Sequence, residues 1–189
     1  RTLSARGHRV RVLARRRALA RVAAGCEAFL GDALHAESIR SAMRRGDVVV
    51  QLVGTPHPGP MKGDDFRRVD LASVTACVQA AESAHIARLV YVSVAHPAPV
   101  MRDYIAVRRE GERLIREARL PATVLRPWYV LGPGHWWPVV LLPLYALASR
   151  IPSLKQASER LGLVTLAQMV RALTMAVETP VAMGEVRVM

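Results

Sequence analysis

Five short stretches rich in β-branched and apolar residues recur along the chain, with helix-like segments between them. They are VRVL at 10–13, CEAFLGD at 26–32, DVVVQLVG at 47–54, RLVYVS at 88–93 and ATVLRP at 122–127. The third and fourth stretches are almost wholly apolar instead of alternating, which is typical of strands that helices cover on both faces. Strands of this kind alternating with helices predict an α/β fold built on a doubly wound parallel sheet.

The clearest helical segment runs from Asp103 to Arg119. Along it a stripe of apolar and small residues recurs at spacings of three and four, from Tyr104 through Val107 and Gly111 to Ile115. With 189 residues, of which 51% are hydrophobic and 22% charged, the chain has enough apolar material for one folded domain and does not resemble a disordered protein.

The chain is strongly basic, with 27 Lys and Arg against 15 Asp and Glu and a formal net charge of +12. The arginines are spread over most of the chain and have few aromatic residues beside them. A solvated, arginine-rich surface therefore explains them better than a nucleic-acid interface. We expect a small-molecule substrate and no nucleic-acid partner.

The two cysteines, Cys26 and Cys77, lie far apart, without a CxxC spacing or nearby His pairs. The sequence therefore predicts neither a metal site nor a disulfide framework, and it fits a reducing, cytoplasmic setting. The longest apolar run, PVVLLPLYALA at 138–148, is too short to span a membrane. Because Trp136 and Trp137 precede it, the run could lie on a membrane surface. The interpretation that we favour is an apolar lid or an interface segment.

The segments that follow the predicted strands are the candidate ligand site, because loops at the carboxyl ends of parallel strands line the crevice of such folds. The loops at 54–65 and 95–103 and the segment after Pro127 belong to this set. Within it, Asp32 could accept a hydrogen bond from an adenine amino group, and Gly54 would let ribose and phosphates approach the backbone. The alternative is that these residues only form the turns that end strands.

Three arginines, Arg15 to Arg17, follow the first predicted strand. In a dinucleotide-binding fold an acidic residue at the end of the second strand would bind the adenosine ribose, and none is present. An arginine cluster there can hold a 2′-phosphate, which favours NADP(H) over NAD(H). A solvated basic turn is the other interpretation.

Tyr104 and Arg108 are the strongest catalytic candidates, since residues four apart share one face of a helix. A phenol with a pKa of about 10 is a poor acid or base near neutrality, but a cation beside it favours the phenolate. Tyr104 could then exchange a proton with a hydroxyl or carbonyl while a nicotinamide exchanges the hydride. Packing of the pair against the protein and solvent is the plainer alternative.

Six stretches, in order along nearly the whole chain, match a known family. They are RGHRVRVLAR, GD at 31–32, DVVVQLVGT, ARLVYVSVA, YIAVRREGERLIREARLPATVLRPWYVLGPG and VTLAQMVRALTMAVE. With them the chain resembles the short-chain dehydrogenase/reductase superfamily. More narrowly, it is similar to the extended and atypical branch of NAD(P)-binding epimerase/dehydratase-like and NmrA-like proteins, which includes the complex I accessory subunit. The resemblance implies a Rossmann-like NAD(P)-binding core at 1–134. It also implies a substrate-side segment with a closing helix and strand of the same domain at 135–189.

The resemblance also assigns residues to the site. It implies Tyr104 as the acid/base, Arg108 at the position of the family's lysine, and Ser93 as an accessory donor, although the catalytic serine normally lies where this chain has Ala95. The incomplete set points to the atypical branch, in which many members bind the cofactor without a complete triad. The residues expected to bind the cofactor are Arg15, Arg16, Asp32, Ala33, Val53, Gly54, Thr55, Pro127, Trp128, Tyr129 and Val130.

The family begins with a strand and a glycine-rich turn that holds the pyrophosphate, whereas this sequence opens on RTLSARG, similar to the end of the family's first helix. We expect the chain to be truncated there, and the cofactor to bind only once that strand and loop are restored.

Three functions remain open. The first is an NADP(H)-dependent oxidoreductase or epimerase-like enzyme that acts on a small, apolar carbonyl or alcohol. The second is a non-catalytic cofactor-binding protein, either a redox sensor or an assembly subunit, and the third is a protein that docks on a membrane surface through residues 136–148. The intact Tyr104 favours the first function, while the substituted lysine and missing serine favour the second.

Overall fold

The computed structural model describes residues 1–56, 58–59, 61–98, 100–132 and 162–189. Its central element is a four-stranded parallel sheet in the order β3-β4-β5-β8. The strands are β3 (Val48–Gln51), β4 (Arg88–Val92), β5 (Ala122–Leu125) and β8 (Val186–Val188). Two further parallel pairs join β1 (Val10–Ala14) to β2 (Cys26–Leu30) and β6 (Tyr129–Leu131) to β7 (Leu163–Thr165).

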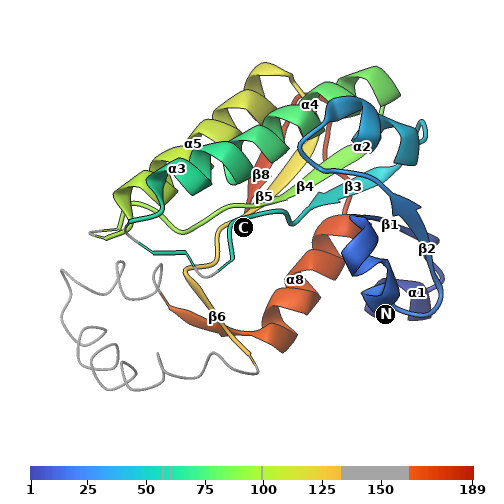
Figure 1. The fold of residues 1–189 in the computed structure, drawn as a ribbon, viewed down its shortest axis with the longest axis horizontal. Helices are drawn as coiled ribbons and strands as arrows, with labels where there is room; N and C mark the ends of the chain where they lie inside the picture. The colour runs from blue at the N-terminus through green and yellow to red at the C-terminus, as the bar shows by residue number, and fades with distance from the viewer. Residues whose placement is uncertain (57, 60, 99, 133–161) are drawn as a thin grey trace.

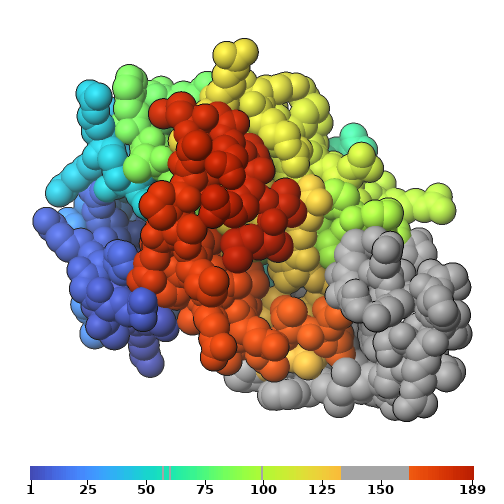
Figure 2. Space-filling view, turned by 180° about the vertical axis from the view of Figure 1, so that it is seen from behind, coloured from blue at the N-terminus to red at the C-terminus, as the bar shows by residue number. Residues whose placement is uncertain are grey.

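Helices cover both faces of the central sheet (Figure 1). On one face lie α2 (Ala36–Ala42), α4 (Ala72–Ala84) and α5 (Arg102–Glu117), with α3 (Gly63–Asp65) and the π-helical turn η2 (Phe66–Leu71) leading into α4. On the other face lie α8 (Leu166–Glu178) and the short α1 (Thr2–Ala5), and a 3-10 helix, η1 (Arg16–Arg21), follows β1. Seen from behind, residues 162–189 lie across the middle of this second face, with the N-terminal residues at one side (Figure 2).

The side chains of β4 explain why its sequence is apolar throughout. Leu89 and Tyr91 are buried in the cluster beneath α4 and α5, whereas Val90 packs on the opposite face with Ala176 and Val177 of α8. Because successive strand residues point to opposite faces, a strand covered on both sides needs an apolar residue at every position. The predicted doubly wound α/β fold is therefore confirmed.

The first helix of the structure ends where the sequence predicts a helix end. The helix α1 ends before Gly7, whose φ of +87° is a conformation that a residue with a side chain rarely adopts. Among the described residues no ladder joins β1 to β3, so each strand keeps one edge without a backbone partner. An ion pair between Arg11, on β1, and Asp47, just before β3, bridges the two sheets.

The C-terminal part of the chain contributes directly to the main sheet. β8 pairs with β5 and extends the sheet at its edge, and α8 begins with a capping box in which Thr165 and Gln168 bond to each other's backbone N–H. The pairing of β6 with β7 is not indicated by the sequence patterns. The apolar run at 138–148, with Trp136 and Trp137, lies outside the described residues. No helix in the described part of the chain is long and apolar enough to cross a membrane.

Candidate functional site

The carboxyl ends of β3 and β4 gather a connected group of polar side chains, which we call the Asp70 cluster: Gly54, Thr55, Asp70, Tyr104 and Arg108. Gly54 and Thr55 follow β3, Asp70 lies in η2, and Tyr104 and Arg108 project from α5. The parallel topology brings them together because both strands end at the same edge of the sheet.

Asp70 is the centre of this cluster. One carboxylate oxygen accepts a hydrogen bond of 2.6 Å from Nη2 of Arg108. The other accepts from the backbone N–H of Thr55 at 2.8 Å and from its hydroxyl at 2.6 Å. The Asp70 side chain is fully buried and that of Arg108 is 8% exposed. Such a desolvated, charge-assisted network holds the loop after β3 against α5.

Gly54 is required by this packing. A Cβ atom placed on it would collide with the guanidinium of Arg108 and lie 3.1 Å from Oδ1 of Asp70. A glycine at this position therefore makes room for the ion pair between Asp70 and Arg108. The sequence-based prediction gave another reason for this glycine, namely the approach of ribose and phosphates to the backbone. The structure does not test that predicted role.

Tyr104 is held between an aromatic ring and a cation. Its ring lies 5.0 Å from that of Phe66, centroid to centroid, at an interplanar angle of 58°. The guanidinium carbon of Arg108 lies 5.1 Å from the Tyr104 centroid. Burial raises the pKa of Tyr104 above its ordinary value, the charge of Arg108 opposes this rise, and the charge of Asp70 adds to it. The sequence-based expectation of a lowered pKa is therefore wrong, because burial outweighs a cation whose charge is shared with Asp70.

Ser93, the predicted accessory donor, belongs to a different contact. It is buried at the end of β4, and its hydroxyl donates to Oε1 of Glu112 at 2.7 Å. Glu112 is 1% exposed and also accepts hydrogen bonds from Arg126 and Arg116. Although burial opposes ionisation, these bonds hold the pKa of Glu112 below its ordinary value. In this arrangement Ser93 could donate to a substrate only if its bond to Glu112 broke.

A second group of predicted residues meets where β1 and β2 end. The backbone N–H of Gly31 donates to the carbonyl of Ala14 at 3.1 Å, which places the β2 end beside Arg15 and Arg16. Oδ1 of Asp32 accepts a hydrogen bond from the backbone N–H of Leu34, so the side chain forms the turn there.

Ala33, in the same turn, is partly buried, and both arginines are exposed. The predicted adenosine-side residues are thus neighbours in the fold, and the structure tests no role for them in binding.

The segment after β5 is part of a small sheet rather than an open loop. The carbonyl of Pro127 accepts a hydrogen bond from the N–H of Ala95 at 3.1 Å, which ties the segment to the loop after β4. Tyr129 and Val130 lie in β6, paired with β7, and Trp128 is partly buried just before it. Val53, next to the Asp70 cluster, donates its N–H to the buried side chain of Gln51 at 2.9 Å.

Unpaired donors at the carboxyl edge fit a nicotinamide dinucleotide. Arg15 and Arg16 have no ion-pair partner among the described residues and can offer their N–H groups to a phosphate. Nε of Arg108 is buried and has no hydrogen-bond partner within the described chain. Because a buried N–H without a partner is costly, this atom is available to a ligand hydroxyl or carbonyl. The described ranges contain no group of three or more His, Cys, Asp or Glu side chains arranged to hold a metal.

Sequence reasoning missed Asp70 and gave no role to Glu112. Both carry a signal that could have identified them, because each is a carboxylate on the buried face of a helical segment, with Asp70 preceding Val74 and Cys77 at helical spacing. A charged residue in such a stripe must be paired to be tolerated, which predicts a buried ion pair.

A family model described as NAD(P)H-binding matches residues 1–133. The chain is 27% identical over 132 residues to a ceramide reductase of Caulobacter vibrioides (strain NA1000 / CB15N). That match covers 70% of the chain and 41% of the length of the reductase. The chain therefore spans less than half of that relative.

Solved structures share the fold at low sequence identity. A short-chain dehydrogenase/reductase superfamily protein from Agrobacterium tumefaciens with bound NAD superposes with a TM-score of 0.70 at 16% identity, over 100% of this chain and 72% of its own. The Bordetella bronchiseptica enzyme WbmG, in complex with NAD and UDP, gives a TM-score of 0.62 at 15% identity, over 100% of this chain and 66% of its own. These likenesses establish the fold.

Proposed function

Because the chain belongs to the NAD(P)H-binding family and has the fold of the short-chain dehydrogenases and epimerases, we propose that it acts as an NADP(H)-dependent reductase. The observation that carries the proposal is the Asp70 cluster, which fixes a partly buried Tyr104 beside a cation at the carboxyl edge of the sheet. In open parallel sheets this edge is where ligands bind.

The cofactor would lie along the same edge. Arg15 and Arg16, with Asp32 and Ala33, would hold its adenosine end, while Gly54, Thr55 and the segment Pro127 to Val130 would line its nicotinamide end. Exposed arginines in place of an acidic residue support NADP(H) over NAD(H). Because β1 and β3 each keep an edge without a ladder partner in the described part of the chain, we extend the proposal to a strand and phosphate-binding loop encoded upstream.

The protonated state of Tyr104 suits the role of an acid in a reduction. A phenol with an ordinary pKa of about 10 already keeps its proton near neutral pH, and burial raises the pKa of Tyr104 further. Its hydroxyl can therefore donate a proton to the oxygen of a carbonyl substrate as that oxygen becomes negative. When bound, the reduced cofactor supplies the hydride that the carbonyl carbon receives. The cation of Arg108 would stabilise the phenolate that remains after the proton leaves.

An apolar carbonyl compound is the substrate class that we propose. The support is the similarity to a protein named ceramide reductase, whose name specifies a lipid substrate and a reduction. The apolar run at 138–148, expected from the sequence to lie on the substrate side, agrees with this class. An epimerase-like reaction would first require an oxidation, for which a protonated Tyr104 is poorly suited at neutral pH.

The experiment is a comparison of wild type with Tyr104→Phe, each as residues 1–189 and as a version extended upstream in the reading frame. We expect the extended wild type to bind NADPH in calorimetry and to consume it with a panel of apolar ketones and aldehydes. Tyr104→Phe should bind NADPH as tightly and lose turnover by about 10²- to 10⁴-fold. Unchanged turnover in the variant would exclude Tyr104 as the proton donor.

A non-catalytic cofactor-binding protein, such as a redox sensor or an assembly subunit, is the second candidate. It is favoured by the hydrogen bonds that commit Ser93 to Glu112 and Arg108 to Asp70, because two of the three predicted catalytic side chains then have structural partners. NADPH binding by the extended protein without turnover of any carbonyl in the panel would favour this candidate.

A further inference from the structure

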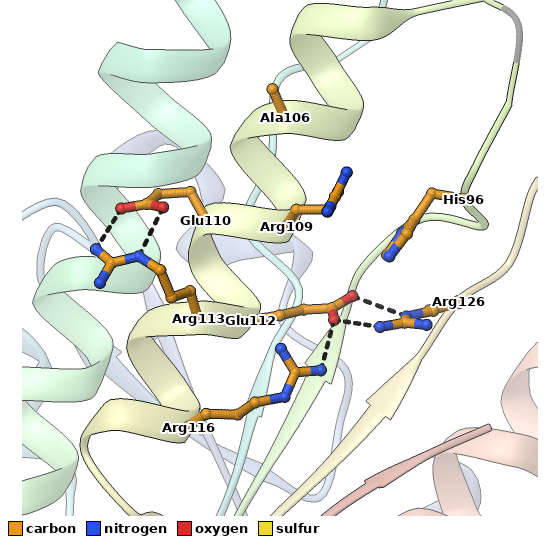
Figure 3. Close-up of a pocket in the computed structure, with 8 residues that line it drawn as sticks. All are labelled: His96, Ala106, Arg109, Glu110, Glu112, Arg113, Arg116 and Arg126. Atoms are coloured by element: carbon orange, nitrogen blue, oxygen red, sulfur yellow. Dashed lines mark hydrogen bonds and ion pairs between the residues drawn. The ribbon is translucent and has the colours of Figure 1, made fainter.

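A pocket of about 540 Å³ lies against α5, and neither Tyr104 nor Arg108 lines it. Figure 3 shows the residues that do. The helix supplies Arg109, Arg113 and Arg116 to its wall, and these residues recur at spacings of three and four, so they share one face. The end of β5 supplies Arg126, and the loop after β4 supplies His96. Three separate elements therefore direct basic side chains into one hollow.

The charges in this pocket do not cancel. Four arginines line it against two glutamates, Glu110 and Glu112. Arg113 pairs with both Glu110 and Glu117, while Arg116 and Arg126 share the single carboxylate of Glu112. With these three carboxylates counted, the hollow keeps a surplus of positive charge equal to about one arginine, and this charge attracts an anion.

Some of the side chains that line the pocket are held by ion pairs, whereas others have no such partner. Arg126 and Arg116 are anchored on Glu112, whose carboxylate is almost fully buried, so their remaining N–H groups are held in place. Arg109 has no hydrogen-bond or ion-pair partner within the described residues. Nδ1 of His96 donates to the carbonyl of Val94 at 3.0 Å, so Nε2 of the neutral ring is left as an acceptor.

The shape and charge of the pocket select among anions. Its volume is in the range of small-molecule sites and exceeds what one carboxylate would fill. A phosphate monoester carries about −1.5 to −2 charges at neutral pH and has three oxygens that accept hydrogen bonds from several directions. Arginine is the side chain best suited to such groups, because its planar fork donates to two oxygens at once.

We propose that this pocket binds the phosphate group of a small phosphorylated molecule, at a site separate from the Asp70 cluster. Arg109 and Arg126 contact the phosphate oxygens, and Glu112 holds Arg126 and Arg116 in position. The site differs from the predicted 2′-phosphate site of the cofactor, because Arg15 and Arg16 lie at the end of β1 and do not line this pocket.

The test is a titration of the protein with inorganic phosphate and, separately, with pyrophosphate. Binding is measured from the NMR chemical shifts of the backbone amides, and chloride keeps the ionic strength constant. We expect saturable shifts in α5 around Ala106 and Arg113. Arg109→Gln should raise the Kd about tenfold, since it removes one charge-assisted contact and breaks no internal bond. The matched control is Arg102→Gln, which removes the same charge from the exposed start of the same helix.

The outcomes distinguish a specific phosphate-binding site from non-specific attraction by the net positive charge of the protein. A tenfold loss in Arg109→Gln, with the Kd of Arg102→Gln within about twofold of wild type, supports the proposal. Equal weakening in both variants would show that only the net charge matters and would overturn it. Shifts confined to the end of β1, or no saturable shifts at all, would overturn it as well. Unchanged thermal unfolding of Arg109→Gln establishes that the variant is folded.

Discussion

The carboxylate of Asp70 and the guanidinium of Arg108 form a buried ion pair of 2.6 Å, although the two residues lie 38 positions apart in the sequence. The same carboxylate fixes Thr55, and the same guanidinium donates to the carbonyl of Val92 at 3.0 Å. The pair thus joins η2, α5 and the ends of β3 and β4 in one network. The surroundings of Tyr104 depend on this network, because Arg108 also lies over the Tyr104 ring.

Breaking one half of this pair should be more harmful than removing both halves. Asp70→Asn leaves the Arg108 charge buried without a counter-ion and should lower the free energy of unfolding by about 3–5 kcal/mol. The double variant Asp70→Asn/Arg108→Met removes that charge and should be less destabilised than Asp70→Asn alone. Chemical denaturation of the two single variants and the double variant measures the coupling. Additive effects of the two changes would contradict this view of the pair.

Gly54→Ala should be destabilising for a steric reason. The new Cβ would collide with Arg108 and approach Asp70, and both partners are fixed by their ion pair. We expect a loss of about 1–3 kcal/mol in the free energy of unfolding, as for overpacking of a dense interior. Gly59→Ala is the matched control, since nothing lies within 4 Å of a Cβ there. Equal stability of the two variants would contradict the packing argument.

The fold follows from the sequence because its signals are local. A strand that is covered on both faces needs a continuous run of apolar residues, and the run at 88–93 shows this pattern. A helix that is covered on one face needs an apolar stripe at helical spacing, as along 103–119. The positive φ of Gly7 likewise matches the predicted helix end. The pairing of β6 with β7 has no such local signal, since it joins residues more than 30 positions apart in a pairing that no pattern near Tyr129 specifies.

The site was less predictable than the fold, because it depends on contacts between distant segments. Spacing alone placed Tyr104 and Arg108 on one face of α5, as observed. It could not reveal that Asp70 would share the charge of Arg108, nor that burial would raise the Tyr104 pKa. The partner of Ser93 was equally hidden, because Glu112 meets β4 only in the folded chain.

The stability of the protein should fall steeply in alkali, in part because of Tyr91. Burial raises the pKa of Tyr91 to about 12, and the charge of Arg108 opposes this only in part. Because the folded pKa exceeds the unfolded value of about 10, the contribution of the neutral phenol is fully present below pH 10 and is lost as the pH rises toward 12.

Tyr91→Phe should remove this dependence. Between about pH 10 and pH 12 the free energy of unfolding of wild type should fall by about 2–3 kcal/mol more than that of the variant. Cys77, whose pKa burial also raises to about 12, is present in both proteins and cancels in the comparison. Parallel curves of stability against pH, measured by urea denaturation, would mean that Tyr91 does not titrate in this range.

The choice between NADPH and NADH should depend on the arginines at the end of β1. Arg15→Gln/Arg16→Gln removes two exposed guanidinium groups that have no ion-pair partner among the described residues, so no structural bond is lost. Each charge-assisted bond to a phosphate contributes about 1.5–3 kcal/mol, so the NADPH affinity of the extended protein should fall by about tenfold or more. The NADH affinity should hardly change, because NADH lacks the 2′-phosphate.

Arg21→Gln is the control for this experiment, because Arg21 is exposed at the far end of the same 3-10 helix. This substitution lowers the net charge near the site without removing a proposed contact. The affinities for NADPH and for NADH should therefore fall by the same small factor. Fluorescence titration with both cofactors, repeated at two salt concentrations, distinguishes a direct contact from long-range attraction, which salt screens. If Arg15→Gln/Arg16→Gln weakened NADPH and NADH equally, the 2′-phosphate assignment would be wrong, and the solvated basic turn would be the better interpretation of this segment.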